Sequence, residues 1–248
     1  MKPRIAFPIA AVAAGLLALA GLTGIAVPVD AGTDCEGRAV TIPGTDGDDT
    51  IGGTKSADVI EAGAGEDVIE GLGGNDTICA GEGDDRVDGG RGNDRIDGGD
   101  GNDYLEESDG DGTVAGGLGD DTVVGHAGID TAEGGPGHDR IRGGTGFDTL
   151  IGGPGGDTLE PEKGHDVVDG GPGGDTAVYA HEPAAVIADL GKHSTIRSAG
   201  RDSLPSIENL TGSRFDDELY GDGAPNVLGG GAGHHRLVGR GGKDTVLQ

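Results

Sequence analysis

The sequence is short of the side chains that usually fill a protein core. Its 248 residues contain no Trp, three Tyr, three Phe and one Met. A conventional globular enzyme needs a sizeable apolar core, and the material for one is thin here. Low apolar content with high net charge is otherwise typical of an unfolded chain. The composition leaves disorder, or a repeat that something other than a hydrophobic core holds together.

Positive charge is scarce as well. Lys and Arg number 17 against 45 Asp and Glu, which gives a formal net charge of −28. Nucleic-acid-binding proteins present a basic face, so this charge excludes nucleic acid as a partner. Glycine is abundant, with 56 residues, but it does not recur at every third position as collagen requires.

Common catalytic motifs are missing from the sequence. It contains neither the G-x-S-x-G of a nucleophile elbow nor the H-E-x-x-H of a zinc protease. No Asp-rich stretch has the spacing of an EF-hand loop, and no G-x-G step is completed to a dinucleotide fingerprint. These absences favour a protein that is not an enzyme.

The N-terminal segment, residues 1–31, differs from the rest of the chain. Lys2 and Arg4 precede an uncharged apolar run from Ile5 to Val29. This pattern predicts a secretory signal peptide over residues 1–31, cleaved after Ala26 or after Ala31, the latter favoured. A transmembrane anchor is the alternative, because the run is long enough to span a bilayer. We therefore expect a secreted, extracellular protein that leaves the membrane once the signal is cleaved.

Cys35 and Cys79 are the two cysteines of the sequence. In an exported protein two cysteines predict one disulfide, and two free thiols are the alternative. The bridge would tie a cap segment, residues 32–43, to the chain that follows.

A nine-residue repeat occupies most of the remaining sequence. The pattern is G-G-x-G-x-D-x-U-x, where U is apolar, and it runs through fifteen unbroken units over residues 44–178. After a segment at 179–211, a second, degenerate array occupies 212–248. Representative units are 89–97 GGRGNDRID, 116–124 GGLGDDTVV and 152–160 GGPGGDTLE.

Each unit predicts a turn of six residues followed by a strand of three. Glycine permits the positive φ angles and close backbone approach that such turns need. One inward apolar residue per unit fits a solenoid whose units bury that residue against their neighbours. The predicted inward residues are Ile51, Ile60, Ile69, Ile78, Val87, Ile96, Leu105, Val114, Val123, Ala132, Ile141, Leu150, Leu159, Val168 and Ala177.

A core this sparse cannot offset the conformational entropy of ordering glycine-rich turns. The Asp residues of those turns would also repel one another. A hard cation that takes oxygen ligands resolves both problems.

The motif resembles the hemolysin-type calcium-binding repeat of the repeats-in-toxin (RTX) family. The resemblance covers residues 44–178 and 212–247. It implies an all-β fold, a right-handed parallel β-roll in which two nonapeptides make one coil. It also implies multiple Ca²⁺ ions between turns two units apart, held by turn carbonyls and by the carboxylate of the sixth residue.

Carried onto this sequence, the resemblance places the sixth-position acids in two columns. The first column would contain Asp49, Asp67, Asp85, Asp103, Asp121, Asp139, Asp157 and Asp175. The second column would contain Asp58, Asp76, Asp94, Asp130, Asp148 and Asp166. In the second array, Asp217 and Asp244 fit the same position.

Some units depart from the pattern. In the unit 107–115 (ESDGDGTVA), Gly112 stands at the sixth position. Either Asp109 or Asp111 substitutes as a ligand, or a site is missing, and we expect the second column to be interrupted there. Asn226 and His235 stand at the sixth position in the second array. Because His is a poor Ca²⁺ ligand, this end is expected to bind metal weakly.

The segment between the arrays is also similar to the family. Residues 202–213 (DSLPSIENLTGS) resemble the sequence that often separates RTX arrays. We expect residues 179–211 to form extra strands that continue the roll.

The leading hypothesis is a secreted, non-enzymatic calcium-binding protein that folds when it meets Ca²⁺ outside the cell. One alternative is a calcium-dependent adhesin or surface-structural spacer, with a cell-surface polysaccharide or protein as partner. The other is the accessory repeat of a secreted hydrolase. It is disfavoured because only about a dozen residues separate the predicted signal peptide from the first repeat.

Overall fold

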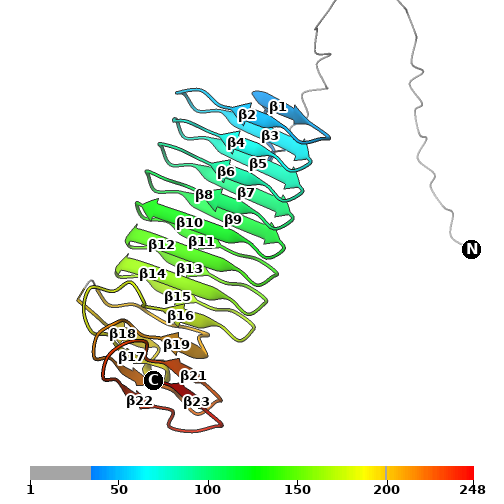
Figure 1. The fold of residues 1–248 in the computed structure, drawn as a ribbon. Coiled ribbons are helices and arrows are strands. Elements are labelled where there is room, and N and C mark those ends of the chain that lie inside the picture. Colours follow the sequence, from blue (N-terminus) through cyan, green and yellow to red (C-terminus); the bar gives the residue numbers. More distant parts are fainter. Residues whose placement is uncertain (1–34, 199) are drawn as a thin grey trace, which may run out of the picture. The chain divides into compact units, whose positions relative to one another are not determined.

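The computed structural model describes residues 35–198 and 200–248. The predicted signal peptide lies outside these residues. The described part is an all-β parallel solenoid without an α-helix, and its coils stack in sequence order (Figure 1). The expected β-roll is confirmed. No helix in this part of the chain has the length and apolar character needed to cross a bilayer.

Two parallel sheets form the body of the roll, and the chain alternates between them. The first sheet has the order β1 (Ile42–Thr45), β3 (Val59–Ala64), β5 (Thr77–Glu82), β7 (Arg95–Asp100), β9 (Thr113–Leu118), β11 (Thr131–Glu133), β13 (Thr149–Ile151) and β15 (Val167–Asp169). The second sheet has the order β2 (Thr50–Gly52), β4 (Val68–Glu70), β6 (Arg86–Asp88), β8 (Tyr104–Glu106), β10 (Thr122–Ala127), β12 (Arg140–Gly146), β14 (Thr158–Gly164), β16 (Thr176–Val178), β19 (Asn209–Thr211), β21 (Val227–Gly229) and β23 (Thr245–Leu247).

The strand register follows the repeat length. Ile60 pairs with Ile78, and Ile78 pairs with Ile96, each partner lying two repeat units further along the chain. Two nonapeptides therefore make one coil. All fifteen residues predicted to point inward are buried, with at most 8% of their surface exposed, because strand alternation turns the same position of every unit toward the interior.

Several strands are longer than the three residues expected from the repeat. β3, β5, β7, β9 and β10 contain six residues each, and β12 and β14 contain seven. The extra residues are the first residues of the following unit, which continue the pairing even where a glycine has a positive φ angle, as at Gly63 and Gly81. The first residues of a turn therefore take part in the hydrogen-bonded pairing between strands.

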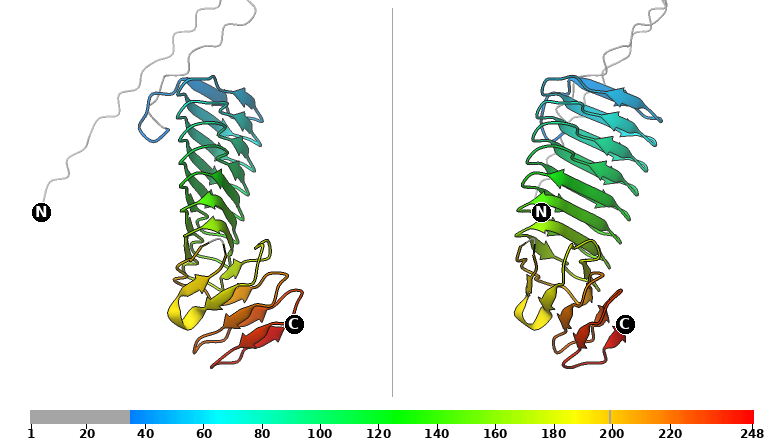
Figure 2. Two further views of the ribbon diagram at one scale, coloured as in Figure 1. Left: turned by 90° about the vertical axis from the view of Figure 1, so that its left-hand side faces the viewer. Right: turned by 60° about the vertical axis from the view of Figure 1, so that its left-hand side comes forward.

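The segment between the arrays interrupts the alternation of strands. A third sheet has the order β18 (Ser194–Ile196), β17 (Ile187–Asp189), β20 (Glu218–Tyr220) and β22 (Arg236–Val238). β17 and β18 pair antiparallel, and the 3₁₀ turn η1 (Leu190–Lys192) joins them. β19 pairs with β16, so the second sheet continues past this segment. Figure 2 shows the strands of this region from two further sides.

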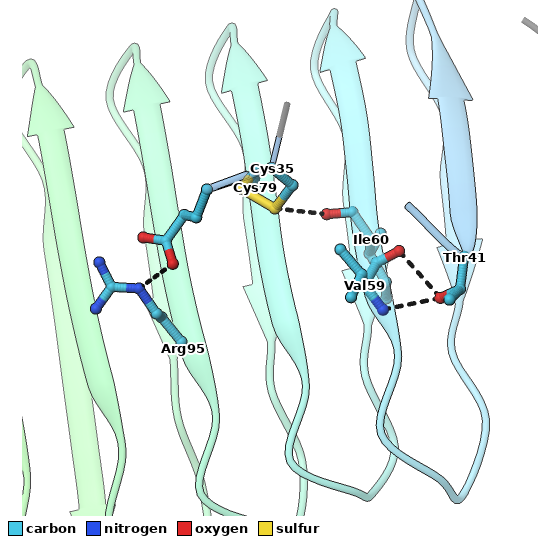
Figure 3. The surroundings of a disulfide bond; sticks show 7 residues. Cys35, Thr41, Val59, Ile60, Cys79 and Arg95 are labelled. Carbon is cyan, nitrogen blue, oxygen red and sulfur yellow. Dashed lines mark hydrogen bonds and ion pairs between the residues drawn. A yellow bond between two sulfur atoms is a disulfide. The ribbon is translucent and has the colours of Figure 1, made fainter. Parts of the chain in front are cut away.

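A disulfide joins Cys35 to Cys79 on β5 (Figure 3). It fastens the chain before β1 to the third strand of the first sheet. Glu36 pairs with Arg95 on β7 beside it, and the Thr41 hydroxyl accepts a 2.8 Å hydrogen bond from the Val59 N–H. The start of the roll is therefore fixed to the coils that follow it.

Candidate metal centre

The sixth-position acids lie where each turn ends and each strand begins. Members of the first column precede the strands of the second sheet, and members of the second column precede the strands of the first sheet. From Asp67 to Asp175 every one of these Asp residues is at most 2% exposed. The array thus buries acids that would ordinarily stay in water.

One oxygen of each carboxylate has a structural partner. The Asp85 backbone N–H donates to Asp103 Oδ1 over 2.8 Å, and the Asp121 N–H donates to Asp139 Oδ1 over 2.9 Å. The same bond recurs along both columns, from the residue at one turn to the acid two units later. These bonds fix the orientation of the carboxylates from Asp67 onward in the first column and from Asp76 onward in the second.

The second oxygen is left over. The buried Oδ2 atoms without a hydrogen-bond partner among the described residues belong to Asp67, Asp76, Asp85, Asp94, Asp103, Asp121, Asp130, Asp139, Asp148, Asp157 and Asp175. An unpaired buried anion is costly, because neither water nor a counter-charge compensates it. The regular recurrence of this atom makes each column a row of unsatisfied acceptors.

Turn glycines keep a space open in front of these oxygens. A Cβ added at Gly98 would collide with Asp103 Oδ2 and with the carbonyl oxygen of Gly116, and a Cβ at Gly116 would collide with Asp121 Oδ2 and the Gly134 carbonyl oxygen. The first glycine of such a unit therefore faces a space bounded by one carboxylate oxygen and one turn carbonyl.

Burial changes the acidity of the columns. Desolvation raises the pKa of Asp103 and Asp139 to about 7, with neighbouring acids adding to the effect. The same cause raises the pKa of Asp85 and Asp130 to about 6. At neutral pH the columns hold negative charge that a cation would stabilise.

These residues fit Ca²⁺, which takes carboxylate and carbonyl oxygens as ligands. Across residues 35–198 and 200–248, no three acidic, His or Cys side chains gather as a metal cluster. The donors are instead single carboxylates set beside backbone carbonyls, in agreement with the ligand set that the resemblance implies.

The first acid of each column differs from the others. Asp49 Oδ2 accepts hydrogen bonds from the Thr45 N–H at 2.7 Å and the Thr45 hydroxyl at 2.8 Å. Asp58 Oδ2 is bound in the same way by Thr54. Thr45 and Thr54 stand at the second position of these units, where the consensus has glycine. The N–H and hydroxyl of each Thr donate to the Oδ2 atom that has no partner in later units.

The second column ends at a buried arginine. Asp202 takes the next sixth position, since its Oδ1 accepts the Asp166 N–H. Nη2 of Arg197 lies 2.8 Å from Asp166 Oδ2 and 2.7 Å from Asp202 Oδ1, while Nη1 lies 2.6 Å from Glu182 Oε1. The guanidinium is fully buried and holds a positive charge between two successive carboxylates. Asp166, expected as a metal ligand, has its Oδ2 occupied by an arginine.

The first column continues through the segment between the arrays and into the second array with other residues. Glu208 Oε2 accepts the Asp175 N–H, and Asp244 Oδ1 accepts the Asn226 N–H. Asn226 thus stands in line with the acids, as its position in the repeat predicts.

Asp217 and His235 occupy the corresponding positions beside the third sheet. Ser213 closes the turn of Asp217 through its N–H and its hydroxyl. His235 Nδ1 accepts the Asp217 N–H over 3.2 Å. These turns are therefore held largely by protein groups.

In the unit 107–115, neither Asp109 nor Asp111 brings its carboxylate to the place beside Gly112. Asp109 is largely exposed and lies 3.7 Å from Arg91. Asp111 Oδ1 accepts the Ile129 N–H over 2.8 Å. The carboxylate beside Gly112 belongs to Glu107, which is fully buried.

A second ladder runs along the outside of the turns. Fifth-position side chains accept the backbone N–H of the fifth residue two units later, as Asn102 does for Asp120 and Asp120 does for His138. The sequence signal is the frequent Asn or Asp before the sixth-position acid, which the repeat consensus treats as variable. Asp111 belongs to this outer ladder.

A comparison with protein families agrees with this geometry. A family model described as the RTX calcium-binding nonapeptide repeat (four copies) matches residues 43–78, 80–114, 108–141, 115–150, 133–168, 142–177 and 211–246. A search of the curated proteins found no match.

Proposed function

The chain belongs to the RTX calcium-binding nonapeptide repeat family, whose repeats bind multiple Ca²⁺ ions, and from this premise we propose that it is a secreted, non-catalytic protein that folds on Ca²⁺ outside the cell. The observation that carries the proposal is the row of buried Asp Oδ2 atoms without a partner in the described chain. A roll that buries these charges lacks cohesion until cations neutralise them.

We assign the binding role to the acids with an unpaired Oδ2. They are Asp67, Asp85, Asp103, Asp121, Asp139, Asp157 and Asp175 in the first column and Asp76, Asp94, Asp130 and Asp148 in the second. The other acids of the columns have partners within the protein. Thr45 and Thr54 bind Asp49 and Asp58. Arg197 binds Asp166, and Ser213 binds Asp217. Asp244 lies at the edge of the last coil and is a weaker candidate.

Calcium supplies positive charge and a flexible oxygen coordination shell to these turns. Extracellular calcium modules bind at roughly 0.1–1 mM. With free ion about tenfold above that value, each site adds about 1.4 kcal/mol of stability. Several such sites match the whole stability of an ordinary domain, so export into a calcium-rich medium would drive folding.

Calorimetry and circular dichroism of the purified chain test the proposal. Titration of Ca²⁺ into chelated protein should produce a β-sheet spectrum and bind several ions per chain, whereas Mg²⁺ at equal ionic strength should not. A β-sheet spectrum that stays unchanged in excess chelator at about pH 8 would refute calcium-dependent folding.

A matched pair of variants locates the effect. Asp103→Asn should raise the Ca²⁺ midpoint, while Asp100→Asn should not, because Asp100 is exposed outside the columns. Recovery of the protein from the medium tests export. Mass spectrometry of the recovered protein tests signal cleavage, and a chain that keeps the whole segment 1–31 would contradict cleavage.

A further inference from the structure

The unit 107–115 departs from the repeat at three positions, yet its backbone pairing does not. Glu107 and Ser108 replace the first two glycines, and Gly112 replaces the sixth-position acid. The Glu107 N–H still donates to the Val124 carbonyl, and the Thr113 N–H still donates to the Asp94 carbonyl. The turn between β8 and β9 therefore keeps its place in the stack (Figure 1).

The first and sixth positions of a unit share one space. In ordinary units a Cβ at the first position meets the acid of the same unit, as at Gly89 with Asp94 Oδ2 and at Gly125 with Asp130 Oδ2. In the unit 107–115 the relation is reversed. A Cβ added at Gly112 would collide with Cγ and the carboxylate of Glu107. Glu107 thus fills, from the opposite side, the volume that an acid at position 112 would take.

The surroundings of Glu107 are those of a column member. Its side chain is fully buried, and within the described part of the chain neither carboxylate oxygen has a hydrogen-bond partner. Asp94 and Asp130, its neighbours along the column, each have an unpaired Oδ2 as well. Three buried acids in succession have no counter-charge of the kind that Arg197 supplies to Asp166.

The acidity of Glu107 agrees with this placement. Burial, reinforced by the charge of Asp130, raises its pKa to about 8, while the Asp94 backbone N–H acts in the opposite direction. In the units around it, the corresponding backbone N–H donates a hydrogen bond to the Oδ1 of the acid two units later. At this unit it faces the Glu107 carboxylate.

We propose that Glu107 is a Ca²⁺ ligand of the second column, replacing the acid that position 112 lacks and making the column continuous from Asp76 to Asp148. This inference rests on the proposed function. Glu107 brings its carboxylate to the place that the acid of the unit takes elsewhere in the column, and Ca²⁺ accepts carboxylate oxygens as ligands. A Ca²⁺ site at Glu107 would stand where we expected the second column to be interrupted, beside Gly112.

The test counts bound Ca²⁺ in a set of variants by equilibrium dialysis and metal analysis. Glu107→Gln keeps the side-chain shape and removes the charge, and it should lose about one bound ion per chain and raise the folding midpoint in Ca²⁺. Asp109→Asn and Asp111→Asn are the controls, and they should keep the wild-type ion count.

A double variant keeps the test informative if Glu107→Gln fails to fold. Glu107→Gly with Gly112→Asp restores the consensus residues at the first and sixth positions and should bind the wild-type number of ions, whereas Glu107→Gly alone should not. An unchanged ion count in both Glu107→Gln and Glu107→Gly would overturn the assignment. Wild-type protein that binds no Ca²⁺ would instead overturn the proposed function.

Discussion

At the scale of single residues, the two oxygens of each column Asp have different tasks. Oδ1 accepts a backbone N–H from the turn before it, as Asp103 does from Asp85, and this bond orients the carboxylate. Oδ2 then points into the space in front of the first glycine, where it meets no donor of the described chain. The protein thus positions an acceptor that it does not itself satisfy, and protons and metal ions compete for it.

This competition predicts an unusual dependence of stability on pH. Burial raises the pKa of Asp103 and Asp139 from 3.8 to about 7 and that of Asp85 to about 6. Without metal, the folded roll therefore binds more protons than the unfolded chain between about pH 4 and pH 7. Its stability is present below the ordinary Asp pKa and is lost as the pH rises through these raised values.

Chelated protein should accordingly gain β-structure when the pH falls from 8 to 5. Calcium-loaded protein should lose stability over the same range, because protons displace the ion from the same oxygens. Circular dichroism with urea denaturation, with chelator and with Ca²⁺, measures both slopes. Identical slopes in the two conditions would contradict the competition.

Gly98, the first residue of its unit, gives a second prediction at the scale of single residues. Gly98→Ala places a methyl group against Asp103 Oδ2 and the Gly116 carbonyl oxygen. We expect a loss of about 1–3 kcal/mol in unfolding free energy from overpacking, together with weaker Ca²⁺ binding.

The matched control for that substitution is Gly174→Ala. A Cβ at Gly174 meets nothing within 4 Å. Urea denaturation in Ca²⁺ compares the two variants, and equal midpoints would show that the space beside Asp103 is not critical.

At the scale of elements, the period of the repeat was enough to predict the stack. The nine-residue phase placed one apolar residue of each unit inside, and the pairing of the strands from β1 to β14 with the strand two units later follows from two units per coil. The lengths of the strands were not predictable from the period, because glycines at the start of a turn, such as Gly63, also satisfy the ladder.

The candidate site was predictable where the consensus holds and less so where it fails. For the acid that is missing at position 112, the sequence indicated the neighbouring acids Asp109 and Asp111 as substitutes. The useful signal was the exchange within one unit, an acid at the first position and a glycine at the sixth. Arg197 gave no such signal, because it reaches the second column from the segment between the arrays.

Arg197 supplies the positive charge at the end of the second column, and its replacement gives a prediction at this scale. Arg197→Met leaves Asp166, Glu182 and Asp202 buried without their counter-charge. Breaking a buried ionic cluster from one side costs about 3–5 kcal/mol. Urea denaturation in saturating Ca²⁺ should register this loss, while Arg201→Met, at an exposed position, should stay within about 0.5 kcal/mol of wild type. Equal stability of the two variants would remove Arg197 from this role.

At the scale of the whole molecule, two kinds of cohesion are distributed along the chain. The array has one inward aliphatic residue per unit and many buried acids. The region from Tyr179 to Tyr220 buries an aromatic residue, Tyr179, together with aliphatic residues such as Leu190, Leu204 and Leu210. It also contains its own cation in Arg197. In a solenoid each coil contacts only its neighbours, so local differences of this kind become local differences in stability.

We therefore expect calcium removal to unfold the molecule unevenly. In excess chelator, hydrogen exchange should be fast over residues 62–160, where the unpaired acids of both columns are concentrated. It should stay slower over residues 187–220, where Asp202 and Asp217 are bound by Arg197 and Ser213.

Mass spectrometry of exchanged peptides, with and without Ca²⁺, resolves the two regions. Arg197→Met should abolish the residual protection in chelator, because the remaining acids would then lack compensation as they do in the array. Equal exchange in both regions, or slower exchange in the array, would mean that cohesion is not divided in this way. Protection that returns first in the coils next to residues 187–220 as Ca²⁺ is added would identify this end as the template onto which the coils stack, since each new coil needs a formed neighbour to pair with.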